Sequence, residues 1–109
     1  SYGRTWTAPR DTMIAILPVG YADGLVRNLG GNFSVTIRES RCPLVGRICM
    51  DQCMVDVGPD PKIRRWEEVT VFGPGTLTAA DMAVAAGTIP YEITCNINKR
   101  VPRIYRDSR

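Results

Sequence analysis

The sequence predicts a mainly β fold: a small, closed or partly closed antiparallel barrel that carries one or two short helices. Three observations predict it. Short runs of strand-forming residues recur along the chain, and turns rich in glycine and proline separate them. One segment, residues 78–86, carries a complete set of helix signals. The length of 109 residues matches one domain, residues 1–109, with a single core.

The strands follow from apolar runs and from alternation. Residues 13–19 form an apolar run that predicts a buried strand, and Pro18 places its end at an edge or a bend. Residues 33–38 alternate apolar and polar side chains, which predicts a half-exposed strand. Further strands are predicted at residues 53–57, 69–72 and 103–105.

The first helix is predicted over residues 78–86. Thr78 is a capping residue, Asp81 stands three positions later as a capping box requires, and Gly87 supplies a left-handed stop. Residues 89–97 are ambiguous, because their apolar positions fit both a strand and a helix. Pro90 suits a first helical turn, so a short helix is favoured there.

Composition excludes several classes of protein. The net charge of +3 is too small to indicate nucleic acid by itself, and no apolar run approaches the roughly 20 residues of a membrane span. Basic residues gather after residue 98, which predicts a solvated terminal segment or an anion-binding edge. A nucleic-acid-binding barrel would rest on this tail alone, and Tyr105 is its sole aromatic residue for stacking on bases.

The reactive residues are few. The chain has no histidine, which removes the commonest zinc ligand and the usual general base. Its four cysteines lack the spacing of a disulfide framework or a metal site, so buried, reduced thiols are expected. The two lysines, Lys62 and Lys99, lie in a proline-rich loop and a basic tail. Both are expected to be solvated, so neither suits a Schiff base.

Two stretches break the pattern of an ordinary β domain. In residues 45–57, apolar strand formers run into Arg47, Asp51 and Gln52 before alternation resumes, and such breaks are typical of functional sites. In residues 20–24, Tyr21 follows a predicted strand at a glycine-flanked turn.

These residues by themselves leave alternatives open. Tyr21 fits a packed or interface tyrosine as well as an acid–base group, and a free phenol needs a nearby cation or hydrogen bonds to act near neutral pH. Met50 fits the core, Arg47 and Asp51 fit an ordinary ion pair, and Asp23 with Asp51 gives a weak signal for a hard cation.

Five blocks, in order along the chain, closely resemble the C-terminal domain of alanine racemases. The blocks are Ser1-Tyr2-Gly3-Arg4-Thr5, Gly20-Tyr21-Ala22-Asp23-Gly24, Val45-Gly46-Arg47-Ile48-Cys49-Met50-Asp51-Gln52, Tyr91-Glu92-Ile93 and Arg100-Val101-Pro102-Arg103. Any one block alone is a weak signal, but five in order are a strong one. The sequence departs from the family at Leu25-Val26-Arg27, where many members have an aromatic residue and a proline after Gly24, so the shape of that loop is open.

The resemblance implies a pyridoxal-phosphate-dependent racemase that interconverts L- and D-alanine for peptidoglycan, in the bacterial cytoplasm. In the family, an N-terminal α/β barrel carries the cofactor lysine, and each C-terminal domain completes the site of the other subunit in a homodimer. The barrel would then lie outside this chain, and the chain would be inactive alone. The chemistry holds the amino acid as an aldimine and uses two acid–base groups on opposite faces, one of them a tyrosine.

The resemblance also assigns roles to individual residues. Tyr21 matches the catalytic tyrosine, the base for the L enantiomer and the acid towards it. Met50 matches the residue whose backbone N–H binds the substrate carboxylate, with Asp51 beside it, and Tyr91 matches a tyrosine that helps hold the cofactor phosphate. Arg47 and Ile89 match residues of the entry corridor. No metal, nucleic acid or membrane contact is implied for this domain.

Two alternatives remain at this point. One is a racemase of serine, because a group of membrane-tethered relatives acts on that amino acid. The other is a non-catalytic β-barrel module used for binding or regulation, for example one appended to a sensor.

Overall fold

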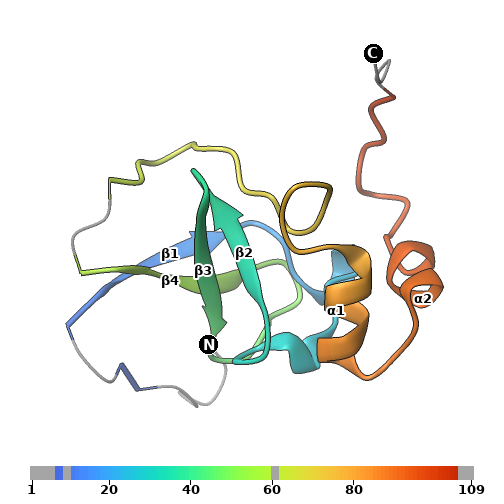
Figure 1. The fold of residues 1–109 in the computed structure, drawn as a ribbon, viewed down its shortest axis with the longest axis horizontal. Coiled ribbons are helices and arrows are strands. Elements are labelled where there is room, and N and C mark those ends of the chain that lie inside the picture. Colours follow the sequence, from blue (N-terminus) through green and yellow to red (C-terminus); the bar gives the residue numbers. More distant parts are fainter. Residues whose placement is uncertain (1–6, 9–10, 60–61, 106–109) are drawn as a thin grey trace.

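The computed structural model describes residues 7–8, 11–59 and 62–105. Two short helical turns, η2 (Tyr21–Asp23) and η3 (Arg27–Leu29), follow the first strand. The strands are β1 (Met13–Leu17), β2 (Ser34–Ile37), β3 (Ser40–Val45) and β4 (Cys53–Gly58), and the helices are α1 (Ala79–Ala86) and α2 (Pro90–Cys95) (Figure 1).

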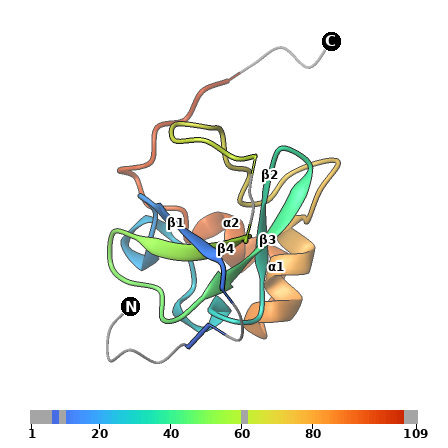
Figure 2. The same cartoon turned by 90° about the vertical axis from the view of Figure 1, so that its left-hand side faces the viewer.

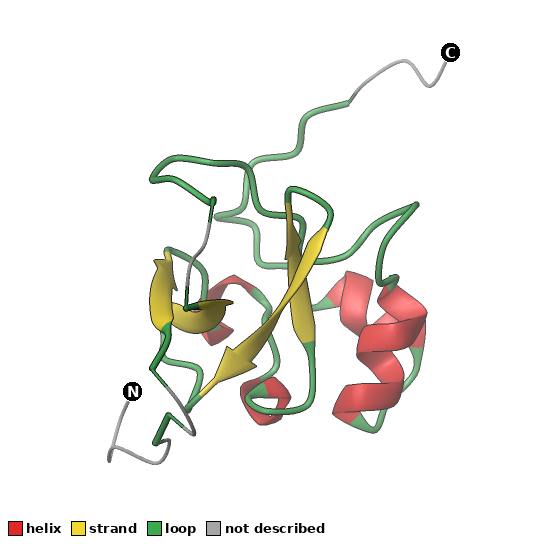
Figure 3. Ribbon diagram, turned by 60° about the vertical axis from the view of Figure 1, so that its left-hand side comes forward, coloured by secondary structure: helices red, strands yellow, loops and turns green. Residues whose placement is uncertain are grey.

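All strand pairs are antiparallel, in the order β1-β4-β3-β2. Most of β3 pairs with β2, and its last two residues pair with β4, at Leu44↔Val55 and Val45↔Met54. The β1–β4 pair therefore runs in a clearly different direction from the β2–β3 hairpin (Figures 1 and 3). The mainly β, antiparallel class with short helices is confirmed, but among the described residues this sheet is open rather than closed.

Two predicted strands are absent from the sheet as described. Residues 69–72 contribute a single bridge, in which Thr36 and Thr70 exchange backbone hydrogen bonds of 2.9 Å. Residues 103–105 form no strand and lead away from the body of the fold (Figure 1). Ile104 and Tyr105 are 76% and 91% exposed, so this segment buries too little apolar surface to offset the entropy of ordering a strand.

The strand predicted from residues 13–19 is present as β1, but the prediction that it is buried was wrong. Leu17 is buried, whereas Met13 and Ile16 are 54% and 64% exposed. The reason is the alternation of side chains along a strand: Ala15 and Leu17 face the core, whereas Ile14 and Ile16 lie on the opposite face of β1 and are exposed. An apolar run cannot by itself distinguish the core from a surface that another body covers.

The core lies between the sheet and the helices. Helix α1 buries Met82 and Ala83, and α2 buries Ile93. Both helices lie behind the strands in Figure 2. The largest fully buried side chains are Leu29, Val35, Ile37, Leu44, Ile48, Cys53, Val55, Met82 and Ile93.

Both helices are confirmed. At the start of α1, the Asp81 N–H donates to the Thr78 hydroxyl at 3.2 Å, and the Thr78 N–H donates to the Asp81 carboxylate at 2.7 Å. Gly87 ends the helix with φ +74°, in the left-handed region. Pro90 stands in the first turn of α2, as its fixed φ favours.

Asp81 makes the cap of α1 sensitive to pH. Hydrogen bonds from Thr78, first its backbone N–H and then its hydroxyl, lower the pKa of the Asp81 carboxyl in the folded chain. The ionised cap therefore stabilises the fold above the unfolded pKa, and this contribution is lost as the pH falls through the lower, folded pKa. We expect Asp81→Asn to lower the melting temperature at neutral pH and to change it less in acid. A melting-temperature difference that is equal at both pH values would contradict this linkage.

Candidate active site

The two stretches that the sequence singles out lie side by side. The Tyr21 N–H donates to the Cys49 carbonyl at 3.0 Å, and the Ala22 N–H donates to the Met50 carbonyl at 3.0 Å. Both bonds join backbone to backbone, so they fix where η2 begins relative to the loop that holds Met50. The fold thus places the backbone of Tyr21 against that of Cys49, the residue before Met50, to which the resemblance assigns carboxylate binding.

Gly20 makes this close approach possible. A Cβ at position 20 would lie 2.2 Å from the Cys49 oxygen and 2.4 Å from the Met50 oxygen, far inside any real contact. The φ of Gly20 is −150°, which any residue adopts, so space rather than backbone conformation requires glycine here.

Tyr21 is partly buried and packs against the hydrophobic core. The Arg27 guanidinium lies over the ring, with its carbon 5.3 Å from the ring centroid. A cation at that distance is attracted to the ring face. Packing, backbone hydrogen bonds and the Arg27 cation therefore all hold Tyr21 and its turn.

The stretch predicted as an interrupted strand is a loop between two strands. β3 ends at Val45 and β4 begins at Cys53, and between them the Cys49 N–H closes a turn onto the Gln52 carbonyl at 2.9 Å. Met50 is 48% exposed, so the alternative that it is a core residue was wrong. Its N–H donates no hydrogen bond to any residue that the structure describes, which leaves a backbone donor available for an anion.

Asp51 pairs with Arg100, so the alternative of an ion pair between Asp51 and Arg47 was wrong. Arg100 Nη2 lies 2.8 Å from Asp51 Oδ1, and Arg100 Nε lies 2.7 Å from Asp23 Oδ1. The Asp51 hydrogen bond, followed by the charge of Asp23, raises the pKa of the Arg100 guanidinium, which stays charged. The two carboxylates considered for a hard cation thus hold a guanidinium, and the described residues contain no cluster able to hold a metal ion.

Three of the cysteines are buried as predicted, namely Cys42, Cys49 and Cys53. Cys95 is exposed instead, because α2 turns Ile93 rather than Cys95 into the core. Burial, and then the neighbouring Cys49, raise the pKa of the Cys53 thiol to about 11. Cys53 is therefore a protonated core residue at neutral pH and not a nucleophile or a base.

The remaining predicted site residues are exposed on the surface. Arg47 is exposed in the β3–β4 loop, Ile89 is 59% exposed beside α2, and Tyr91 is 79% exposed in its first turn. Within the described part of the chain, no hydrogen bond or ion pair joins these side chains to Tyr21, Met50 or Asp51. Lys62 and Lys99 are both exposed, as predicted.

Sequence reasoning assigned no role to Arg100 or Arg27. Arg100 stands in one of the five matching blocks, and that was the available signal. Neither residue type nor spacing could show that a segment 77 residues from Asp23 folds back to it. Arg27 is the last residue of the departure at Leu25-Val26-Arg27. Leu25 is buried with the core, and η3 begins at Arg27.

Comparison with known proteins decides the family. The model for "Alanine racemase, C-terminal domain" matches residues 1–105. The chain belongs to this family. The block at residues 1–5 falls within the match but outside the described residues.

Part of the sequence and structure of individual alanine racemases resembles this chain. The enzyme of Treponema denticola is 56% identical over 98% of this chain, which covers 30% of that enzyme. The alanine racemase of Streptomyces coelicolor superposes with a TM-score of 0.90 at 44% identity, over 96% of this chain and 28% of its own. The Clostridium difficile enzyme, in complex with cycloserine, gives 0.86 at 44% identity, over 93% of this chain and 27% of its own. The chain thus spans less than a third of the relatives that it matches.

Proposed function

We propose that this chain works as the C-terminal domain of a full-length alanine racemase and supplies Tyr21 as an acid–base group. The observation that carries the proposal is the joining of the Tyr21 turn to the Met50 loop by two backbone hydrogen bonds. It joins the turn that carries the partly exposed Tyr21 to the loop whose Met50 N–H donates to no residue that the structure describes. The phenol and this N–H are the two groups that a racemase needs at one face of an amino acid: one to move the α-proton and one to hold the carboxylate.

Each proposed role follows from what the side chain or backbone can reach. Tyr21 would remove the α-proton from L-alanine, and in the reverse direction it would donate a proton to that same face to form L-alanine, while the second acid–base group serves the opposite face. The Met50 N–H would bind the substrate carboxylate with Asp51 beside it, and the exposed Arg47 would attract that carboxylate along the entry corridor with Ile89. Alanine is favoured over serine because relatives that are 56% and 53% identical to this chain are named alanine racemases.

The residues fit pyridoxal phosphate as a cofactor held mainly by another domain. The exposed Tyr91 hydroxyl is free to reach a phosphate outside this chain, whereas Lys62 and Lys99 are exposed and lack the apolar surroundings of a cofactor lysine. When bound, the cofactor supplies the electron sink that makes the α-proton removable.

The exposed apolar residues support a covering partner. Ile16, Met50, Ile89 and Tyr91 are each between 48% and 79% exposed. We propose that an N-terminal barrel and the second subunit of a homodimer cover this surface, with Tyr21 acting across the interface. No helix in the described residues has the length and apolarity to cross a membrane. From the likeness to bacterial alanine racemases, we propose a cytoplasmic location.

Cofactor attachment tests the division of labour between domains. The full-length protein, loaded with pyridoxal phosphate, would be reduced with borohydride and mapped by peptide. We expect the labelled lysine outside residues 1–109, because Lys62 and Lys99 are solvated. Lys62→Arg and Lys99→Arg should racemise alanine at the wild-type rate. Label on either lysine would contradict the proposal.

Racemisation by the full-length protein decides between the two classes of function. An active enzyme with a preference for alanine over serine supports the proposal. Absence of racemisation with cofactor bound would favour the binding or regulatory module instead.

A further inference from the structure

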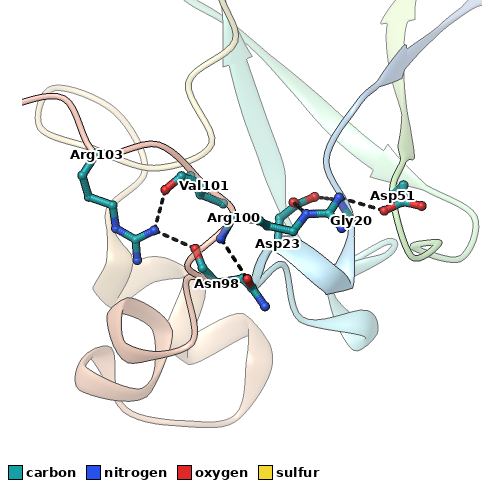
Figure 4. A network of polar contacts seen from close by, with 7 residues as sticks. All are labelled: Gly20, Asp23, Asp51, Asn98, Arg100, Val101 and Arg103. Carbon is teal, nitrogen blue, oxygen red and sulfur yellow. Dashed lines mark hydrogen bonds and ion pairs between the residues drawn. The ribbon is translucent and has the colours of Figure 1, made fainter.

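We propose that Arg100 is a positioning residue that holds the Tyr21 turn against the Met50–Asp51 loop. The inference rests on the proposed function and deepens it. Arg100 acts through Tyr21 and need not touch the substrate. Its segment, after α2, is the third stretch of chain that meets at the site (Figure 4).

The Arg100 guanidinium bridges two segments that lie far apart in the sequence. Its Nε binds Asp23 of η2 at 2.7 Å, and its Nη2 binds Asp51 of the β3–β4 loop at 2.8 Å. A planar guanidinium presents its donors in fixed directions, so satisfying both carboxylates fixes their separation. Asp23 is two residues from Tyr21, and Asp51 is next to Met50.

Asp23 passes this constraint to the backbone that leads into Tyr21. Its second carboxylate oxygen accepts the Gly20 N–H at 2.9 Å, and its backbone carbonyl accepts the Asn98 N–H at 3.1 Å. Arg100 therefore connects through one side chain to the residue that precedes Tyr21 (Figure 4).

Arg100 is itself held in place. Its own N–H donates to the Asn98 side-chain oxygen at 2.9 Å. Arg103 donates to the carbonyls of Ile97 and Asn98 at 2.9 Å and 2.6 Å, which closes the turn that presents Arg100. The Arg100 guanidinium therefore extends from a hydrogen-bonded turn.

The two ion pairs differ in exposure, and this sets their relative strength. The Asp23 side chain is 11% exposed, whereas the Asp51 side chain is 63% exposed. Water and salt screen an exposed pair, so the Asp23 pair should hold the turn more firmly than the Asp51 pair. Removing Arg100 would break both pairs and leave Asp23 partly buried without its cation.

The test separates positioning from a general loss of structure. In the full-length enzyme, exchange of the α-proton of L-alanine with D₂O requires Tyr21, whereas exchange of the α-proton of D-alanine would use the lysine of the other domain. We expect Arg100→Gln to lower L-alanine exchange by ~10–100-fold more than D-alanine exchange, because a displacement of about 1 Å costs up to ~10²-fold. Arg100→Lys should lower L-alanine exchange nearly as much as Arg100→Gln does, because a lysine ammonium lacks the planar, fixed arrangement of N–H donors that a guanidinium has. Asp51→Asn should lower L-alanine exchange less than Arg100→Gln or Arg100→Lys does.

Arg38→Gln is the matched control. Arg38 also forms an ion pair, with Glu67, and its side chain is 57% exposed against 49% for Arg100. It lies in the β2–β3 turn, so its loss should leave both exchange rates unchanged. In a Tyr21→Phe background, Arg100→Gln should lower racemisation no further.

The outcomes are distinct. Equal losses of L- and D-alanine exchange, or a full further loss in the Tyr21→Phe background, would show a merely structural role and overturn the inference. Wild-type exchange of both enantiomers in Arg100→Gln would overturn it as well. An unmodified enzyme that does not racemise alanine would overturn the proposed function, and with it this inference.

Discussion

Tyr21→Phe in the full-length enzyme is expected to lower racemisation in both directions by ~10²–10⁴-fold, the usual contribution of a positioned acid–base group. The ring would keep its packing and its contact with Arg27, because both depend on the ring and not on the hydroxyl. KM for alanine should change little, since the Met50 N–H that would bind the carboxylate is backbone. Rates of L-to-D and D-to-L conversion, measured separately, check the prediction.

Tyr21→Phe should affect α-proton exchange of only one enantiomer. In Tyr21→Phe, exchange of the α-proton of L-alanine with D₂O should be lost, whereas exchange of the α-proton of D-alanine with D₂O should persist. Tyr105→Phe is the control, because Tyr105 is 91% exposed on the segment that leads away from the fold. Wild-type rates in Tyr21→Phe would remove Tyr21 from the mechanism.

The elements that could be predicted from the sequence are those whose causes are local. Helix α1 is one: Thr78, Asp81 and Gly87 satisfy the helix ends within a few residues, and the structure shows those bonds. The two-residue loop between β2 and β3 was not predictable in the same way. Arg38 and Glu39 both have positive φ, as a type I′ turn needs, although that turn usually carries asparagine and glycine. The pairing of Ile37 with Ser40 closes the hairpin instead.

Burial and ion pairing could not be predicted because their causes are distant in sequence. The exposure of Ile16 depends on which face of β1 the rest of the fold covers, and the run of apolar residues is the same in either case. Asp51 stands four residues from Arg47 but pairs with Arg100, 49 residues away. The family resemblance supplied roles for Tyr21 and Met50, and the structure supplied the contacts that join them.

Gly20→Ala is expected to have the largest effect on stability, because its cause is a collision with backbone. The added Cβ would meet two carbonyl oxygens, of Cys49 and Met50, and neither can rotate away as a flexible side chain could. The turn and the loop would have to separate, which would stretch or break the bonds donated by Tyr21 and Ala22. We expect a loss of about 3 kcal/mol of folding free energy, at the upper end of overpacking costs, and a loss of racemisation.

Gly73→Ala is the matched control for this collision. A Cβ there would meet only a methyl group of Thr70, at the ordinary contact distance of 3.7 Å. Its effect should stay within about 0.5 kcal/mol. Chemical denaturation of the two variants of the full-length enzyme, alongside racemisation assays, makes the comparison. If Gly20→Ala unfolded and racemised like Gly73→Ala, the turn and the loop would not be packed as closely as the two backbone hydrogen bonds imply. Tyr21 would then not be held at a fixed distance from the Met50 N–H, and the site would lose the geometry on which the proposed chemistry depends.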